Sequence, residues 1–203
     1  MGRPLIDALV ARGYPVHALV RRGSERRLPP GAVPVIGDAL DPSTFAAAVP
    51  SGATAVHLIG TPHPNPSKAV EFRQVDLASI RAMVLAAQQA GVRHLVYVSV
   101  AHDTPVMREY VSARQDGESL IRESGIPATI LRPLYVLGPG RFWPVLFLPG
   151  YAVLRLLPAT RDRAERLALV PRRAMVAALV RAVEDPPAHG VRAMEIPEIR
   201  RMR

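Results

Sequence analysis

Short apolar runs alternate along the chain with longer amphipathic stretches. Five of these runs are rich in β-branched residues and bounded by Gly, Pro or charge, which is typical of strands buried on both faces. They lie at residues 16–20, 33–36, 53–59, 94–100 and 127–131. Between and after them, helices are predicted over residues 42–49, 67–90, 105–124 and 172–184. This alternation predicts an α/β fold with a parallel sheet built from right-handed βαβ units.

The chain opens with a helix rather than a strand. Residues 2–12 place Leu5, Leu9 and Val10 on one side of an amphipathic helix, and Gly13 is suited to end it. A doubly wound sheet normally begins with a strand, so this start is unusual for the predicted fold.

Composition excludes several classes of site. With 203 residues, of which 49% are hydrophobic and 21% charged, the chain has the make-up of one globular domain with at most a small appendage. The absence of cysteine rules out disulfides, Cys-ligated zinc and a thiol nucleophile. We find no HExxH motif, no close His pair and no Walker A motif, so neither a zinc site nor a P-loop is expected.

The net charge of +9 is concentrated at the two ends of the chain. Residues 1–30 carry six arginines against two acidic residues, residues 155–203 carry eleven against six, and the middle is balanced. The basic ends suit a polyanion or an anionic membrane, or they are simply solvated arginines on outer helix faces. Nucleic-acid binding is disfavoured because no helix-turn-helix, zinc or aromatic RNA-binding motif is present.

One apolar segment stands out near the C-terminal end. Residues 142–154 are uncharged, but they number only 13 and include Pro144, Pro149 and Gly150, so they are too short and broken to span a bilayer. The wider segment 142–157 is instead a candidate to wall a pocket, cap a core or lie on a membrane surface. No apolar stretch of a signal peptide is visible at the N-terminus, and a cytoplasmic location is therefore expected.

Several short motifs, in order, carry a family resemblance. They are Gly2-Arg3-Pro4-Leu5, Val20-Arg21-Arg22, Gly37-Asp38-Ala39-Leu40, Val96-Tyr97-Val98-Ser99, Tyr110 to Arg114, which is similar to YxxxK, and Ser124 to Pro133, which contains an LRP turn. Their order and spacing resemble the extended or atypical short-chain dehydrogenases/reductases, especially the NmrA-like and complex I accessory-subunit-like branch. The resemblance implies a Rossmann-like doubly wound parallel sheet with helices on both faces. It also implies an NAD(P)-binding domain over residues 1–140 and a small C-terminal helical, substrate-side segment over residues 141–203 packed on it.

In that family the first strand runs into a GxxGxxG turn that holds the pyrophosphate. Gly2 matches the last Gly of the turn, whereas the strand and the first two Gly have no counterpart here. Because that strand is central in the 3-2-1-4-5-6 order, the strands at 16–20 and 54–59 are expected to lose their shared neighbour and leave backbone groups unpaired. We interpret this as a truncated gene product or a misplaced start codon. The alternative is a domain that truly lacks the strand and repacks or borrows one.

The resemblance implies which residues bind the adenosine end of the cofactor. The expected cofactor is NADP, and NAD is the alternative. Arg21 and Arg22 follow a strand at the place where an Arg accommodates the 2′-phosphate, and no acid lies beside them. Asp38 is expected to accept from the adenine amino group, with Ala39 and Leu40 flanking the ring. The alternatives are an exposed turn for the arginines and a turn or helix cap for Asp38.

The resemblance also assigns the rest of the cofactor path. Its residues are Gly2 at the phosphates, Gly60 and Thr61 after one strand, Ser99 after the next, and Pro133 and Tyr135 beside the nicotinamide carboxamide. Ordinary loop and strand-ending turns are the alternatives at these positions.

Tyr110 and Arg114 are the candidate catalytic residues. They lie four apart on one helix face, where the family has a Tyr that moves the substrate proton and a cation that lowers its pKa and holds the ribose. The alternative is a half-buried Tyr110 and an Arg114 that pairs with Glu118 at the surface. The positions of the family's catalytic Ser or Thr hold Val100 and Ala101, so the catalytic set is incomplete. His102 lies nearby as a further candidate acid or base, or as ordinary polar surface.

Two classes of function therefore remain open. One is an NADPH-dependent oxidoreductase acting on a small apolar carbonyl or enone. The other is a non-catalytic NADP(H)-sensing, assembly or interaction protein, or a truncated form with impaired cofactor binding. A homodimer through the helices at 67–90 and 105–124 is a further expectation.

Overall fold

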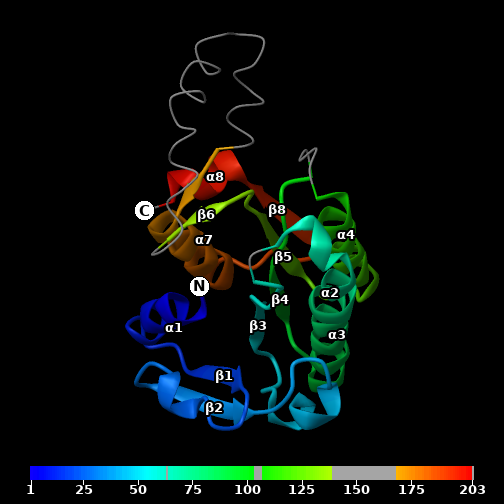
Figure 1. Ribbon diagram of the computed structural model, residues 1–203. Coiled ribbons are helices and arrows are strands. Elements are labelled where there is room, and N and C mark those ends of the chain that lie inside the picture. Colours follow the sequence, from blue (N-terminus) through cyan, green and yellow to red (C-terminus); the bar gives the residue numbers. More distant parts are fainter. Residues whose placement is uncertain (63, 103–106, 139–167, 203) are drawn as a thin grey trace, which may run out of the picture.

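Parallel strands form the centre of the protein in the computed structural model, which describes residues 1–62, 64–102, 107–138 and 168–202 (Figure 1). One sheet pairs β1 (Val16–Val20) with β2 (Ala32–Ile36). A second has the order β3 (Thr54–His57), β4 (His94–Val98), β5 (Ala128–Arg132) and β8 (Val191–Glu195). Short strands β6 (Val136–Leu137) and β7 (Val170–Pro171) pair separately. Every pairing is parallel, and the doubly wound α/β class is thereby confirmed.

Helices cover both sides of the strands (Figure 1). On one side lie α1 (Gly2–Val10), α7 (Arg172–Glu184) and α8 (Ile196–Arg201). On the other lie α3 (Ala78–Ala90) and α4 (Arg108–Glu123). Before α3 the chain forms the 3₁₀ turn η4 (Pro66–Lys68), α2 (Ala69–Glu71) and the π-helical segment η5 (Phe72–Leu77). Further 3₁₀ turns are η1 (Glu25–Arg27), η2 (Pro42–Thr44) and η3 (Ala46–Ala48).

Two apolar cores sandwich the four-stranded sheet. The first joins Leu5 and Leu9 of α1 to Leu179 of α7 and to Val96 and Leu131 of the strands. The second packs α3 and α4 against the opposite face of the sheet. Its buried residues include Ile80, Val84, Leu95, Tyr97, Ile121 and Ile130. β4 and β5 are therefore buried on both faces, which explains their continuous apolar sequence.

The strands separate into two sheets between β1 and β3. These strands are not hydrogen-bonded to each other, and within the described part of the chain each has a hydrogen-bonded neighbour strand on one edge only. Their residues are mostly half-buried, in contrast to the almost fully buried β4 and β5. The expectation that these two strands lack a shared neighbour is confirmed, and the side chain of Thr54 is left with a buried Oγ1 that has no hydrogen-bond partner among the described residues.

Most expected elements form with small shifts of their ends. The predicted helix at 42–49 is instead the two 3₁₀ turns η2 and η3, because Asp41 caps Ser43 and the chain turns again at Phe45. No strand was predicted at β8, because the C-terminal segment that contains it was expected to be helical. In the structure β8 pairs with β5. The apolar segment 142–157 lies outside the described residues. Within the described part of the chain, no helix combines the length and hydropathy needed to cross a bilayer.

Candidate functional site

The carboxyl ends of β3, β4 and β5 meet at one edge of the four-stranded sheet, because these strands are parallel and adjacent. Gly60 and Thr61 follow β3, Ser99 follows β4, and Pro133 follows β5. In open α/β sheets this edge is where ligands bind. These four expected site residues therefore lie at the edge of the sheet that the fold uses for binding.

Arg114 connects this edge to α4 from a buried position. Its side chain is only 7% exposed, and Nη2 lies 2.6 Å from Oδ1 of the buried Asp76. Nη1 donates to the carbonyl of Val98 at 3.0 Å, and Nη2 donates to the carbonyl of Ile59 at 3.3 Å. The interpretation of Arg114 as a surface partner of Glu118 is wrong, because its guanidinium is turned inward to Asp76 and the strand ends.

The loop after β3 is shaped around this guanidinium. A Cβ atom on Gly60 would overlap Nη2 of Arg114, so only glycine leaves the required space. Thr61 donates to Oδ2 of Asp76 through its backbone N–H at 2.8 Å and through its hydroxyl at 2.6 Å. Asp76 therefore ties the loop after β3 to α4.

Sequence reasoning missed Asp76. It lies in the π-helical segment η5, where an extra residue per turn locally reorients the side chains. The missed signal was its spacing: Asp76 stands midway between Phe72 and Ile80, both of which are buried at intervals of four residues. A carboxylate on the apolar stripe of a helix needs a buried partner, and Arg114 supplies it.

Tyr110 lies one turn before Arg114 on α4 and is half-buried. The Arg114 guanidinium carbon is 5.3 Å from the Tyr110 ring centroid and 5.7 Å from that of Tyr97, so the cation lies between two aromatic rings. Phe72 meets the Tyr110 ring edge-on with centroids 5.1 Å apart. The hydroxyl of Tyr110 makes no hydrogen bond to another described residue, and it therefore keeps its donor and acceptor capacity.

Two pKa values record the environment of this cation. Burial alone would lower the pKa of Arg114, but the neighbouring Tyr110, Tyr97 and Asp76 outweigh it and raise that pKa. Burial raises the pKa of Tyr97 to about 12, although the charge of Arg114 opposes the shift. Both residues consequently keep their protons throughout the physiological range, and Arg114 acts as a fixed positive charge.

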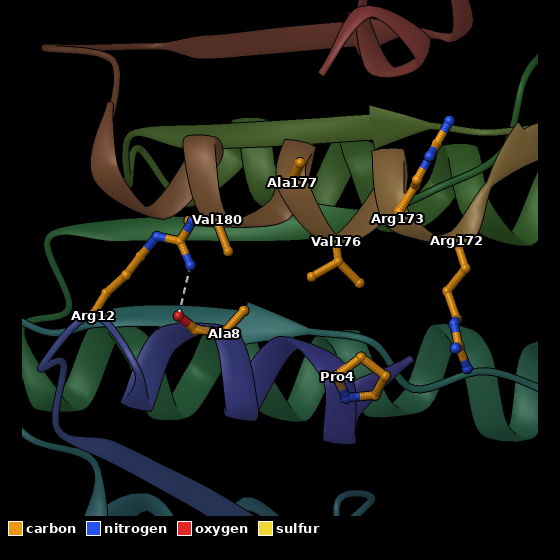
Figure 2. A pocket seen from close by; sticks show the side chains of 8 residues that line it. All are labelled: Pro4, Ala8, Arg12, Arg172, Arg173, Val176, Ala177 and Val180. Carbon is orange, nitrogen blue, oxygen red and sulfur yellow. Dashed lines mark hydrogen bonds between the residues drawn. The ribbon is translucent and has the colours of Figure 1, made fainter. Parts of the chain in front are cut away.

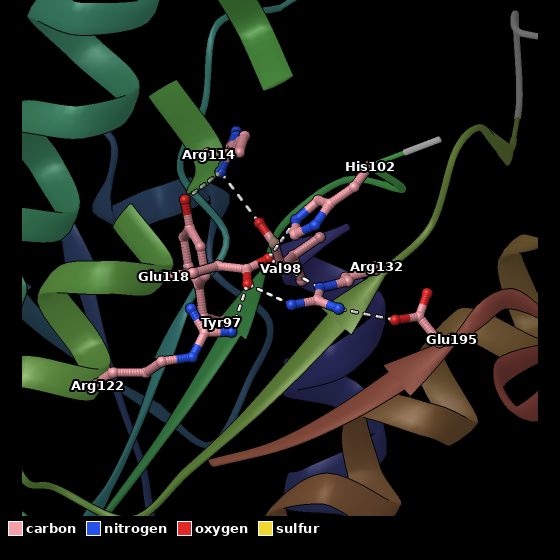
Figure 3. Close-up of polar contacts among 8 residues, drawn as sticks. All are labelled: Tyr97, Val98, His102, Arg114, Glu118, Arg122, Arg132 and Glu195. Atoms are coloured by element: carbon pink, nitrogen blue, oxygen red, sulfur yellow. Dashed lines mark hydrogen bonds and ion pairs between the residues drawn. The ribbon is translucent and has the colours of Figure 1, made fainter. Parts of the chain in front are cut away.

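Glu118 forms a second buried polar cluster one turn further along α4 (Figure 3). Its carboxylate accepts from Nε of Arg132 at 3.0 Å, from Nη2 of the same residue, and from Nη2 of Arg122 at 2.9 Å. Nε2 of His102 is 3.0 Å from Oε1. Burial opposes ionisation of Glu118, but the hydrogen bonds and charge of Arg132 prevail and lower its pKa to about 2. Arg132 also binds Glu195, the last residue of β8, so this cluster joins α4, the segment after β4, β5 and β8.

Gly117 lets α4 approach the sheet closely enough for these contacts. A Cβ at this position would lie 2.7 Å from the hydroxyl oxygen of Tyr97. Glycine inside a helix costs about 1 kcal/mol relative to alanine, so the close approach must offset that cost.

The residues that were expected at the adenosine end of a cofactor lie at the ends of the two strands of the β1–β2 sheet. Arg21 and Arg22 are exposed directly after β1. Oδ1 of Asp38 accepts from the backbone N–H of Leu40 at 3.0 Å, so Asp38 stabilises a turn with one of its oxygens. The helix-cap alternative belongs to Asp41, which accepts from the backbone of Ser43. Among the described residues, no hydrogen bond or ion pair connects these adenosine-side residues to the cluster around Arg114.

The remaining predicted site positions are Pro133, Tyr135 and Gly2, and at the first two the backbone carbonyl accepts a hydrogen bond. The carbonyl of Pro133 accepts from the N–H of Ala101 at 3.1 Å, and that of Tyr135 accepts from Val170 at 2.9 Å. At Gly2, a Cβ would meet nothing within 4 Å, so the space beside the first turn of α1 is open. No group of three or more acidic or histidine side chains among the described residues is placed to hold a metal ion.

Comparison with known proteins identifies the family. Residues 1–139 match the family described as NAD(P)H-binding. The chain belongs to this family. This match confirms the predicted NAD(P)-binding family, and the fold agrees with that of a short-chain dehydrogenase/reductase superfamily protein over 96% of this chain.

Two solved structures illustrate the likeness in fold. One is the Bordetella bronchiseptica enzyme WbmH in complex with NAD⁺, with a TM-score of 0.68, 18% identity, and coverage of 96% of this chain and 71% of that one. The other is a short-chain dehydrogenase/reductase superfamily protein from Agrobacterium tumefaciens with bound NAD, with a TM-score of 0.68, 21% identity, and coverage of 96% and 74%.

Two curated relatives match in sequence. The photosystem II assembly factor Ycf39 of Trieres chinensis is 30% identical over 135 residues, which cover 65% of this chain and 41% of that protein. The 3-diazoavenalumate denitrifying reductase of Streptomyces sp is 32% identical over 169 residues, which cover 69% and 54%. The chain thus spans about half the length of these relatives.

Proposed function

We propose that the protein is an NADP(H)-dependent reductase of the atypical, NmrA-like type, acting on a small apolar carbonyl or a related hydride acceptor. The single observation that carries the proposal is the position of Tyr110. Its hydroxyl is free of other described residues, and the fixed charge of Arg114 lies 5.3 Å from its ring. A phenol hydroxyl in this position can give a proton to a substrate, and a fixed positive charge nearby stabilises negative charge that develops during the reaction.

The described residues fit a dinucleotide better at its adenosine end than at its nicotinamide end. The exposed Arg21 and Arg22 are suited to a 2′-phosphate, and the open space at Gly2 adjoins the N–H groups that begin α1. At the other end, Nη1 and Nη2 of Arg114 are engaged by the protein itself. We therefore assign Arg114 to the electrostatics of Tyr110 rather than to a direct hold on the ribose.

The proposed chemistry divides between cofactor and chain. The dinucleotide, when bound, supplies a hydride to the electrophilic atom of the substrate. Tyr110 gives its proton to the substrate oxygen as the negative charge develops there, and Ser99 at the end of β4 borders the same edge of the sheet. Arg114 and Asp76 hold the helix turn that carries Tyr110.

A second candidate function is a non-catalytic NADP(H)-binding role in assembly or sensing. It is favoured by Val100 and Ala101, which are buried and offer no side-chain hydrogen bond to a substrate carbonyl. The relative named as an assembly factor agrees with this alternative, and the relative named as a reductase agrees with the first.

Cofactor choice is tested by titrating NADPH and NADH into the protein and following nucleotide fluorescence and the melting temperature, which a ligand raises by mass action. Arg21→Ala and Arg22→Ala should weaken NADPH by about tenfold or more and NADH by less than about twofold, because they remove phosphate contacts. Arg26→Ala, in the exposed turn η1, is the matched control. Equal losses for both nucleotides would refute the phosphate assignment.

Catalysis is tested separately with Tyr110→Phe. NADPH consumption is followed with small aldehydes, enones and a diazo compound as hydride acceptors. The variant should bind NADPH as the parent does and lose turnover. An unchanged rate would remove Tyr110 from the chemistry, and NADPH binding without turnover by the parent protein would favour the non-catalytic alternative.

A further inference from the structure

The groove between α1 and α7 has a recessed apolar floor with arginines at its ends (Figure 2). Its volume is about 360 Å³. Pro4 and Ala8 of α1 face Val176 and Val180 of α7 across it. It is lined by residues of α1, of α7 and of the turn after α1, and it shares none with the strand ends that carry the candidate site.

The sequence explains why a groove forms at this place. α1 turns Leu5 and Leu9 into the core, and α7 does the same with Leu179. Between these anchors the residues that face outward are small or short, including Ala8 and Ala177, so the two helices leave a furrow rather than a filled ridge.

Positive charge at the ends of the groove is only partly neutralised. At one end, Arg12 donates to the carbonyl of Ala8 at 2.9 Å and lies 3.4 Å from Glu184. At the other end, Arg172 and Arg173 are exposed and form no ion pair with a described residue. They occupy the first turn of α7, which contains no acid and already carries the positive end of the helix dipole.

The groove brings together arginines from both basic stretches of the sequence. Because α1 packs on α7, Arg12 lines the same groove as Arg172 and Arg173. Arg200 and Arg201, at the end of α8, add charge to the same C-terminal unit. Three arginines from the two basic stretches therefore border one partly apolar groove.

We propose that this groove docks an acidic amphipathic helix of a protein partner. A flat anionic membrane would touch the protruding arginines but could not reach the recessed apolar floor, whereas a convex helix fills it. Nucleic acid would likewise leave that floor unused. Helix-in-groove binding uses apolar anchors on one helix face, and here the flanking cations select acidic residues beside those anchors.

The groove defines the pattern of the partner helix. Arg172 and Val180, near opposite ends, are separated by about 12 Å along α7 at 1.5 Å per residue. A helix with acidic residues at i and i+7 and apolar residues at i+3 and i+4 matches this span. Because the surface is only about two turns long, the interaction should be weak and salt-dependent. This proposal does not depend on the enzymatic one.

The test uses a fluorescent peptide of about 16 residues, which carries Glu at i and i+7 and Leu at i+3 and i+4. Binding to the full chain is measured by fluorescence anisotropy at several salt concentrations. Arg172→Glu should weaken binding by about tenfold, because it reverses a flanking charge. An acid in the first turn favours the helix dipole, so this variant should keep α7 folded. Val176→Gln, which changes the apolar floor, should also weaken binding.

Arg81→Glu is the matched control, since Arg81 is exposed on α3 on the other side of the sheet and the substitution changes net charge equally. It should leave binding within about twofold of the parent. Equal loss with Arg81→Glu would overturn the proposal by showing unspecific attraction, as would failure of the peptide to bind the parent protein. Vesicles that contain anionic lipid are tested in parallel. If the protein binds the vesicles but not the peptide, and Arg172→Glu abolishes vesicle binding, the groove binds a membrane surface and the proposal of a partner helix is wrong.

Discussion

Oδ1 of Asp76 and Nη2 of Arg114 lie 2.6 Å apart, with side-chain exposures of 0% and 7%. Removing one partner of such a pair leaves the other charge buried without compensation, which costs about 3–5 kcal/mol. Asp76→Ala should therefore lower the free energy of unfolding by about that amount, measured by urea denaturation. Thr61 would lose both of its hydrogen bonds in the same variant.

The double variant Asp76→Ala with Arg114→Met separates the pair from the rest of the site. Because it removes both charges, it should cost clearly less than the sum of the two single variants. Additive losses would show that the two side chains do not stabilise one another.

Arg132 and Arg122 bind the same carboxylate of Glu118, but their side chains are 16% and 47% exposed. Because Arg132 is more buried, water screens its ion pair with Glu118 less than it screens that of Arg122. Arg132→Ala is expected to cost about 2–3 kcal/mol and Arg122→Ala less than about 1 kcal/mol, again from urea denaturation. Equal losses would contradict the idea that burial decides the strength of this cluster.

His57 should make stability fall on mild acidification. Burial, together with the charge of Arg114, lowers its pKa to about 3. The hydroxyl of Ser79 donates to the carbonyl of Asp76, so Nε2 of His57 donates to Ser79 and leaves Nδ1 buried without a partner among the described residues. A proton added at Nδ1 would therefore find no acceptor.

The direction of the pH effect follows from the two states. The unfolded chain takes up a proton at His57 as pH falls below about 6.5, whereas the folded chain does not until pH is near 3. His57 should thus remove about 2 kcal/mol of unfolding free energy between pH 6.5 and 5. His57→Leu should flatten this part of the stability profile, and a profile as steep as that of the parent would contradict the assignment. Burial and the charge of Arg192 lower the pKa of His94 to about 4. His94 therefore also lowers the stability on acidification, in the parent protein and in the His57→Leu variant alike.

The interruption between β1 and β3 predicts the effect of an added strand. A β-branched strand joined to α1 by a glycine turn, placed before Met1, should pair with both open edges and slow amide hydrogen exchange in β1 and β3. It should also raise the melting temperature, since it supplies hydrogen bonds and covers half-buried side chains. A matched extension with proline in the strand cannot donate these bonds and should have no effect. Unchanged exchange with the first extension would show that the two edges are not available for pairing.

Strand positions were accessible to sequence reasoning because runs such as 16–20 and 94–98 are apolar and rich in β-branched residues, with one histidine in each. The short helical piece at 42–49 was less accessible, since side-chain caps such as Asp41 decide between one α-turn and two 3₁₀ turns. β8 was missed because Arg192 and Glu195 interrupt its apolar pattern at the sheet margin, where only pairing with β5 makes it a strand.

The sequence by itself determined the α/β class, the order of the first five strands and most helices, and the presence of Tyr110 and Arg114 on one helix face, because these follow from local periodicity and residue spacing. Only the tertiary structure decided that Arg114 turns inward to Asp76, that Glu118 binds two arginines and a histidine, and that Arg12 lines the same groove as Arg172 and Arg173. These contacts join residues far apart in the chain. They could not be predicted from the sequence because a buried charge pairs with whichever opposite charge the fold places next to it, and local spacing does not show that.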